Sequence, residues 1–166
     1  MTKLHLREIP SKAAVYIPIV SRQSDVPIDS SQLIALVQCI LQEEKCRCDE
    51  VSLQFVATEE ISQLHGDYFG DFTATDCISF PIDTQDVPGY RLLGELFICP
   101  AMALSYSQDH GVDPYEELSL YVVHGLLHLM GYDDQDEEER QLMRHAEGRI
   151  IALLRHKGLL LCPLPS

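Results

Sequence analysis

Two histidines with helical spacing lie in the stretch HGLLHLMGYDD, residues 124–134. Side chains four residues apart are neighbours on one face of a helix, so His124 and His128 could bind one ion from a single rigid element. Gly131 is well placed to end that helix in the left-handed conformation and to turn the chain back. The turn would bring Asp134 toward the same ion, and these residues predict a metal site.

The third ligand has alternatives in the sequence. Asp133 is a competing carboxylate one residue earlier, and Asp134 could instead cap the last helix with Glu137 three residues on. The full spacing, His-x3-His-x2-Gly-x2-Asp, matches the extended zinc-protease signature with its last histidine changed to aspartate. Gly125 stands where that signature has its glutamate. We therefore predict that Asp134 joins the two histidines.

Three protein ligands leave a fourth position open for water, which is the arrangement of catalytic zinc sites. Zinc lowers the pKa of such a water toward ~7, and the water would attack the substrate. An anionic third ligand should make that water less acidic than a third histidine would. The predicted cofactor is therefore one Zn²⁺ per chain. A non-haem iron site ranks lower, because the helix-borne spacing is that of zinc hydrolases. The sequence identifies no general acid or base.

The helix that carries the histidines should be central, because it is apolar on most faces. It is predicted from an N-cap at Asp113 through Met130. The sequence as a whole predicts one α+β domain, residues 1–166, with a mixed sheet of about four strands packed with about five helices. The other predicted elements are, in chain order, an edge strand at 14–20 containing Pro18, a helix at 28–46 with Asp29 and Gln32 as a capping box, a strand at 51–58, a helix capped by Thr58 and ending near Gly70, a hairpin of strands 75–82 and 92–99 around a turn-rich loop, a helix from Pro100, and a last helix to Lys157.

Composition and charge limit the partners and the location that we expect for this protein. The formal net charge is -14, and between Glu60 and Glu139 the only lysine or arginine is Arg91. This distribution argues against broad coating of nucleic acid and leaves room for local contacts or for docking on a protein. The apolar runs are too short to cross a bilayer, and the N-terminus lacks a secretory pattern, so we expect a cytoplasmic protein with six unpaired cysteines.

Three motifs together resemble the bacterial YbeY family of rRNA maturation factors, described as single-strand endoribonucleases. HGLLHLMGYDD resembles the family pattern H-G-x-L-H-L-x-G-Y-D-H, TDCISFP (75–81) resembles T-[ND]-V-L-S-F-P, and LLGELFIC (92–99) resembles L-G-D-[IV]-x-I-C. The resemblance covers residues from roughly 64 to 134. Glycine at position 125 is the family's own pattern.

The resemblance implies a zinc-dependent endoribonuclease that acts in small-subunit rRNA 3′ end maturation and ribosome quality control. Its implied partners are rRNA and the ribosome or small-subunit assembly factors, without DNA or membrane. The family's metal ligands carry over to His124 and His128 directly and to Asp134 by position.

One departure from the family concerns the substrate. The segment YFGDFTAT resembles the family's Y-R-G-x-x-x-x-T at Tyr68, Gly70 and Thr75, but Phe69 occupies the arginine position. A guanidinium can clamp phosphate, whereas phenylalanine can only stack on a base. Arg91 is the nearby residue that the sequence offers as a substitute.

Two other functions remain compatible with these residues. The ligand spacing alone also suggests a metallopeptidase-like hydrolase, although Gly125 supplies no general base on the helix. A non-catalytic ribosome-assembly factor, in which the metal only ties the helix to the loop, is favoured by the acidic composition and by Phe69.

Overall fold

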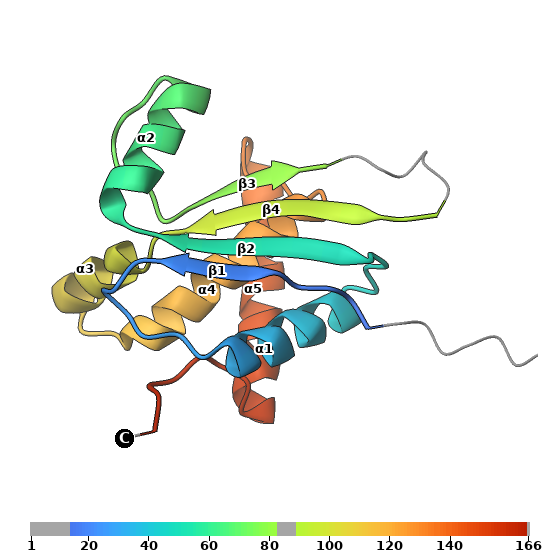
Figure 1. Ribbon diagram of the computed structural model, residues 1–166. Helices are drawn as coiled ribbons and strands as arrows, with labels where there is room; N and C mark the ends of the chain where they lie inside the picture. The colour runs from blue at the N-terminus through green and yellow to red at the C-terminus, as the bar shows by residue number, and fades with distance from the viewer. Residues whose placement is uncertain (1–13, 83–88, 166) are drawn as a thin grey trace, which may run out of the picture.

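The computed structural model describes residues 14–82 and 89–165. Within them it shows four strands and five helices in the predicted order (Figure 1). Residues 1–13, which entered the prediction of a cytoplasmic location, and most of the predicted turn-rich loop lie outside the described residues. The elements are β1 (Ile19–Arg22), α1 (Ser30–Glu43), β2 (Glu50–Val56), α2 (Thr58–Phe69), β3 (Cys77–Pro81), β4 (Leu92–Ile98), α3 (Pro100–His110), α4 (Pro114–Leu129) and α5 (Glu137–Lys157).

The strands form one mixed sheet in the order β1-β2-β4-β3. β1, β2 and β4 run parallel, and β3 pairs antiparallel with β4, which confirms the predicted hairpin. β1 is an edge strand, as predicted. The Pro18 carbonyl accepts a bond from the Leu53 amide at 3.0 Å, so Pro18 faces β2, and its missing amide interrupts the ladder on that side. For the same reason the regular ladder begins at Ile19 rather than at Ala14, and before it only Tyr16 bridges to Glu50.

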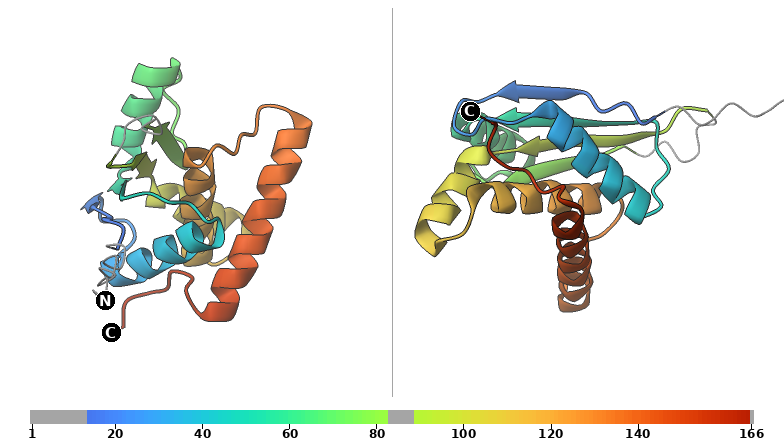
Figure 2. Two further views of the ribbon diagram at one scale, coloured as in Figure 1. Left: turned by 90° about the vertical axis from the view of Figure 1, so that its right-hand side faces the viewer. Right: turned by 90° about the horizontal axis from the view of Figure 1, so that it is seen from below.

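Helix α4 is the centre of the fold. It begins after the predicted N-cap, Asp113, packs on β3 and β4, and also contacts α1, α3 and α5 (Figure 2). A helix that is apolar on most faces is stable only in an interior, and this confirms the predicted α+β fold with a central helix. Its buried side chains form one core with those of α1, the sheet and α5: Leu118, Tyr121, Val122, Val123, Leu126, Leu127 and Leu129.

Helix α4 lies close against the sheet at Gly125. A Cβ added there would lie 2.3 Å from Cδ1 of Leu96 in β4. Ser79 of β3 donates a hydrogen bond from its hydroxyl to the Gly125 carbonyl at 3.0 Å. Position 125 therefore faces the sheet, and only a residue without a side chain fits there without displacing core atoms.

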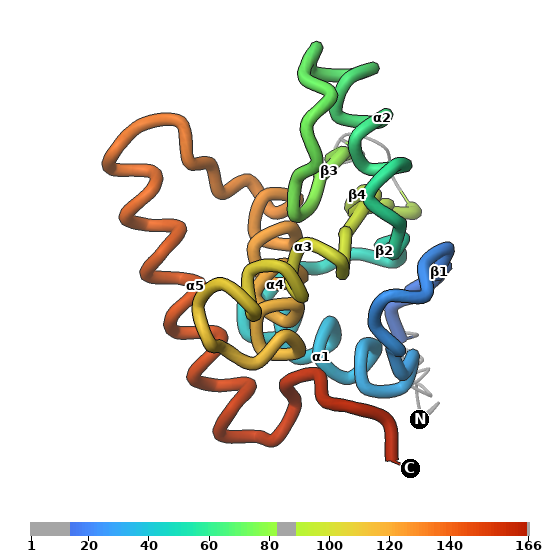
Figure 3. Tube along the Cα trace, turned by 90° about the vertical axis from the view of Figure 1, so that its left-hand side faces the viewer, coloured from blue at the N-terminus to red at the C-terminus, as the bar shows by residue number. Residues whose placement is uncertain are grey.

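Helix α2 stands apart from the other helices, beyond the edge of the sheet and next to β3 (Figures 1 and 3). Its predicted end at Gly70 is confirmed, with φ at +74°. Its predicted cap is wrong: Thr58 is the first helical residue, and Ala57 is the N-cap without a side-chain bond. The Thr58 hydroxyl instead lies 4.0 Å from Sγ of Cys99, a distant residue whose proximity only the folded sheet creates.

Asp29 caps α1 as predicted, but the second half of the predicted capping box is not formed. The Gln32 side-chain oxygen accepts a bond from the Cys162 amide at 3.1 Å and so ties the segment after α5 to α1. The six cysteines are unpaired, as expected. Among the described residues, no helix has the length and apolar character needed to cross a membrane.

Candidate metal centre

The end of α4 folds the chain back onto the two histidines. The Gly131 amide donates to the His128 carbonyl at 3.1 Å, and the Tyr132 amide donates to the Leu127 carbonyl at 3.0 Å. These are the two bonds of a Schellman motif, and Gly131 takes the left-handed conformation, φ +102°, that the motif requires. The predicted helix-ending role of Gly131 is confirmed, and the turn carries Asp134 toward the histidine face of α4.

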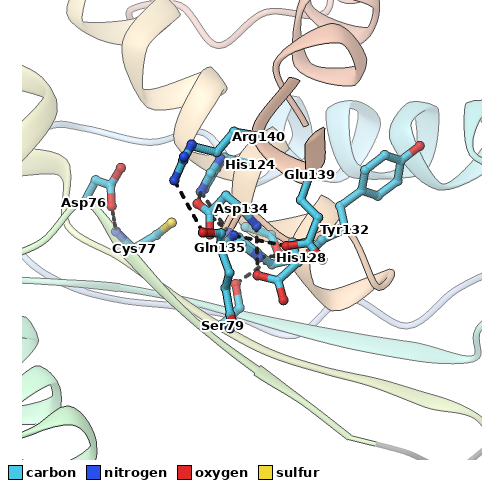
Figure 4. A network of polar contacts seen from close by, with 12 residues as sticks. Asp76, Cys77, Ser79, His124, His128, Tyr132, Asp134, Gln135, Glu139 and Arg140 are labelled. Atoms are coloured by element: carbon cyan, nitrogen blue, oxygen red, sulfur yellow. Dashed lines mark hydrogen bonds and ion pairs between the residues drawn. The ribbon is translucent and has the colours of Figure 1, made fainter. Parts of the chain in front are cut away.

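His124, His128 and Asp134 offer converging ligand atoms that could hold a metal ion (Figure 4). Nε2 of His124 and Nε2 of His128 lie 3.0 Å apart. Oδ2 of Asp134 lies 3.8 Å from the first nitrogen and 3.5 Å from the second. Ligands at bond lengths of 2.0–2.1 Å around a tetrahedral ion are separated by about 3.3 Å. The triangle of ligand atoms therefore has the size that a tetrahedral ion needs.

Hydrogen bonds at the Nδ1 atoms of the two imidazoles determine the orientation of the rings and which nitrogen carries the proton. Nδ1 of His124 lies 2.6 Å from Oε1 of Glu147, and Nδ1 of His128 lies 3.1 Å from the Tyr132 carbonyl. Carboxylate and carbonyl oxygens only accept, so each neutral ring carries its proton on Nδ1. When both rings are neutral, the two Nε2 lone pairs face each other at 3.0 Å, and either a proton shared between them or a bound metal ion relieves their repulsion. The donor set fits a metal ion on this ground.

The two alternatives for the aspartates can now be separated. The cap of α5 is Asp136, which forms a capping box with Glu139, so Asp134 is not needed as a helix cap. Asp133 accepts a bond from the Asp134 amide on its Oδ1 at 2.8 Å and does not belong to the converging group. Of the two, Asp134 has the carboxylate that faces the histidines.

Glu147 comes from α5, 23 residues after His124, and was not recognised from the sequence. Its bond to the imidazole raises the pKa of His124; burial of the ring opposes this, and the charges of Glu147, Asp76 and Asp134 add to the increase. Without an ion, His124 therefore keeps a proton more readily than a free imidazole does. The spacing of Arg140, Arg144 and Glu147 places them on one face of a helix, but it does not show that this face meets His124.

Two clefts meet at this group, and His124, Asp134 and Asp76 line both. The first, which we call the α2 cleft, has a volume of about 590 Å³, and no lysine or arginine is among its described lining residues. The second, the α5 cleft, has a volume of about 280 Å³, and its charged lining residues are Arg140 and Arg144 together with the carboxylates Asp76, Glu117, Asp134 and Glu147. The α2 cleft is lined by His65, Phe69, Thr75, Asp76, Cys77, Ile78, Ser79, Pro81, His124, His128, Gly131, Tyr132, Asp133, Asp134 and Gln135.

The two residues that the sequence singled out for RNA contact lie in different places. Phe69, at the end of α2, lines the α2 cleft. Arg91 precedes β4; its Nη1 donates to the Arg47 carbonyl at 2.8 Å and its amide to Oδ2 of Asp49 at 2.7 Å. Arg91 is not among the lining residues of either cleft, whereas two arginines of α5 are.

In this mixed-sheet α+β fold, the central helix and the turn after it bring together a His–His–Asp group that could hold a metal ion, an arrangement suited to metal-assisted hydrolysis. The family model described as "Endoribonuclease YbeY" matches residues 18–155. The chain therefore belongs to the Endoribonuclease YbeY family, a family of hydrolytic nucleases, as the three sequence motifs predicted.

Relatives with the same description cover nearly the whole chain. The Endoribonuclease YbeY of Protochlamydia amoebophila is 48% identical over 135 residues, which span 81% of this chain and 90% of that protein. The Endoribonuclease YbeY of Chlamydia abortus is 42% identical over 154 residues, 90% of this chain and 98% of the relative. The solution structure of TM1509 from Thermotoga maritima has the same fold, with a TM-score of 0.55 at 24% identity over 86% of this chain and 94% of that one.

Proposed function

We propose that this protein is a zinc-dependent endoribonuclease that cleaves single-stranded RNA. Its proposed role is 3′ end maturation of small-subunit rRNA and ribosome quality control, in the cytoplasm and together with the ribosome or its assembly factors. Membership of the family and the names of the relatives support RNA as the substrate. The observation that carries the proposal is the convergence of two Nε2 lone pairs and the Asp134 carboxylate at the junction of two clefts.

Zinc is the ion that this donor set favours. Two imidazole nitrogens and one carboxylate oxygen are frequent ligands of catalytic zinc, and the ligand triangle has tetrahedral dimensions. When bound, zinc would lower the pKa of water and polarise a phosphoryl oxygen of the substrate. The three proposed ligands are His124, His128 and Asp134, with one ion per chain.

The protein's own groups would position the reactants. Glu147 and the Tyr132 carbonyl hold the two imidazoles with Nε2 facing inward. Asp76 lines both clefts, and its Oδ1 is fixed by the Cys77 amide at 2.7 Å, so this carboxylate can orient the attacking water by accepting a hydrogen bond. Arg140 and Arg144 are the arginines beside the candidate metal group, where a phosphate would need positive charge. Arg140 is already paired with Glu137 at 3.2 Å, so Arg144 is the better placed of the two to contact a phosphate.

The geometry disfavours a metallopeptidase. In that class, a glutamate directly after the first histidine serves as the general base. Here the corresponding position is Gly125, which faces β4, and a Cβ added there would meet Leu96. A glutamate at this position would collide with the core instead of reaching the ion.

Cleavage of rRNA fragments containing the 3′ end of the small-subunit rRNA tests the proposal. We expect the zinc-loaded protein to cleave these fragments and a chelator to stop cleavage. His128→Ala should lose both zinc and cleavage. His156→Ala is the matched control, because His156 is an exposed histidine in the last turn of α5 and should leave both unchanged.

Cleavage that survives in His128→Ala would identify a contaminating nuclease. Zinc-loaded protein that binds the fragments without cleaving them would instead favour a non-catalytic assembly factor.

A further inference from the structure

The side chains that helix α2 contributes to the wall of the α2 cleft are aromatic. His65 and Phe69, four residues apart on α2, line this cleft, and their ring centroids lie 5.7 Å apart with the planes tilted by 53°. Phe69 is 61% exposed, so its ring contributes little to the core. An exposed phenylalanine inside a cleft presents a flat apolar face to whatever enters.

The aromatic wall is held in place by the segment that follows α2. Nδ1 of His65 donates to the Thr73 carbonyl at 2.9 Å, and Asp71 accepts bonds from the Thr73 amide and hydroxyl at 2.9 and 2.8 Å. The Phe72 ring packs onto the helix where Gly66 has no side chain; a Cβ added there would lie 2.0 Å from that ring. The segment is thus folded back against α2, and the His65 ring is oriented before any ligand binds.

Tyr68, the exposed aromatic residue next to Phe69 in the sequence, lies outside the α2 cleft. Tyr68 is 65% exposed, about as much as Phe69, but its ring packs against Phe80 with centroids 4.8 Å apart. Tyr68 does not line the α2 cleft. Phe69 therefore combines exposure, an aromatic face and a place in the cleft that reaches the candidate metal group.

The charges of the α2 cleft limit what its wall can bind. Its described lining residues include Asp76, Asp133 and Asp134 but no lysine or arginine, so apart from the proposed metal site this cleft offers no fixed positive charge to a phosphate. The faces of a nucleobase are neutral and apolar, and stacking on an aromatic ring is their main attraction to protein. Base faces are accessible only when the strand is unpaired.

We propose that Phe69 and His65 form a stacking subsite for one unpaired nucleobase of the RNA strand whose phosphate lies at His124, His128 and Asp134. The inference rests on the proposed function, because it takes RNA as the ligand. It assigns opposite roles to the two clefts: the α2 cleft binds a base by stacking, and the α5 cleft contacts phosphate through its arginines. Recognition on the α2 side is then independent of charge.

The chain contains no tryptophan, so one introduced indole reports its own surroundings. The test compares Phe69→Trp with Tyr68→Trp during titration with an oligoadenylate of about ten nucleotides. The titration is made with chelator present, to prevent cleavage, and again with zinc. We expect the oligoadenylate to quench the indole at position 69 and not at 68. An abasic phosphodiester of the same length should quench neither. Equal responses at the two positions, or quenching by the abasic chain, would overturn the subsite.

Affinity provides a second measurement. Phe69→Leu should weaken binding of the oligoadenylate about five- to 150-fold, which corresponds to one stacked base. Phe69→Tyr should restore most of this loss, and Tyr68→Leu should match the parent. Equal affinity of Phe69→Leu and the parent for the oligoadenylate would contradict the proposal. Because the Phe69 ring is exposed, Phe69→Leu and Phe69→Tyr should leave the thermal unfolding midpoint unchanged.

The two proposals fail in different ways. Quenching specific to position 69, in a protein that cleaves no RNA, would retain the base subsite and reject the nuclease. Cleavage of RNA that is unaffected by Phe69→Leu, with no specific quenching, would retain the nuclease and reject the subsite.

Discussion

Replacing Glu147 by alanine should weaken zinc binding about ten- to 100-fold, the usual effect of losing the partner that orients a ligating histidine. The change corresponds to about 1.4–2.7 kcal/mol. The structure explains why the loss is only partial. Glu147 orients His124, whereas the ring of His128 is held by the Tyr132 carbonyl, which the substitution leaves in place. Glu147→Gln keeps an oxygen acceptor and should lose less affinity than Glu147→Ala.

Competition with a chromophoric chelator measures these affinities directly. Glu138→Ala is the matched control, because Glu138 is an exposed glutamate in the first turn of the same helix. We expect the affinities to fall in the order parent, Glu147→Gln, Glu147→Ala, with Glu138→Ala equal to the parent. Equal zinc affinity of Glu147→Ala and the parent would refute the reasoning that this carboxylate orients a ligand.

The same pair makes a prediction for the metal-free protein. The hydrogen bond to Glu147 raises the pKa of His124, so the pair stabilises the protonated ring. This contribution is fully present below the ordinary histidine pKa of about 6.5 and is lost as pH rises through the raised value. Glu147→Gln should therefore reduce the free energy of unfolding more near pH 6 than near pH 9. Urea unfolding at both values measures this, and a larger loss at the higher pH would contradict it.

Three further substitutions test the site and its setting. Asp134→His replaces an anionic ligand by a neutral one and should shift the pH profile of RNA cleavage to lower pH; an unchanged or higher midpoint would reject this. Gly125→Ala should destabilise the protein by about 1–3 kcal/mol, because its methyl group meets Leu96, and urea unfolding measures the loss. Arg144→Ala should lower RNA affinity and reduce the slope of log affinity against log salt by about 1, whereas Arg91→Ala should leave both unchanged. A salt slope that responds to Arg91 and not to Arg144 would reverse the assignment of the phosphate contact.

The parts of the site that the sequence predicted are those determined within one or two turns of chain. His124 and His128 share a face because helix geometry places them there, and Gly131 turns the chain because its conformation is local. The pairing of Asp134 with the histidines follows from that turn. The same reasoning predicted the element order, because apolar periodicity and caps are also local signals.

The missed features depend on contacts between segments far apart in the sequence. Glu147 meets His124 only because α5 packs on α4, and no spacing within α5 indicates which residue will face the imidazole. The resemblance to the family pattern placed Phe69 at an arginine position, but its place in the cleft follows from where α2 stands beside β3. Arg91 seemed near the site because it precedes β4, but it is hydrogen-bonded to Arg47 and Asp49 on the β2 side of β4. The cleft is lined by β3, on the other side of that strand.

The contact between Glu147 of α5 and His124 also has a consequence for the order in which the site is completed during synthesis of the chain. The three candidate ligands lie close together in sequence and leave the ribosome before the helix that carries Glu147. A nascent chain that ends before α5 thus has the complete ligand set but not the carboxylate that orients His124, and should exchange its ion readily. Tight retention of the proposed ion would therefore depend on α5 having closed on α4.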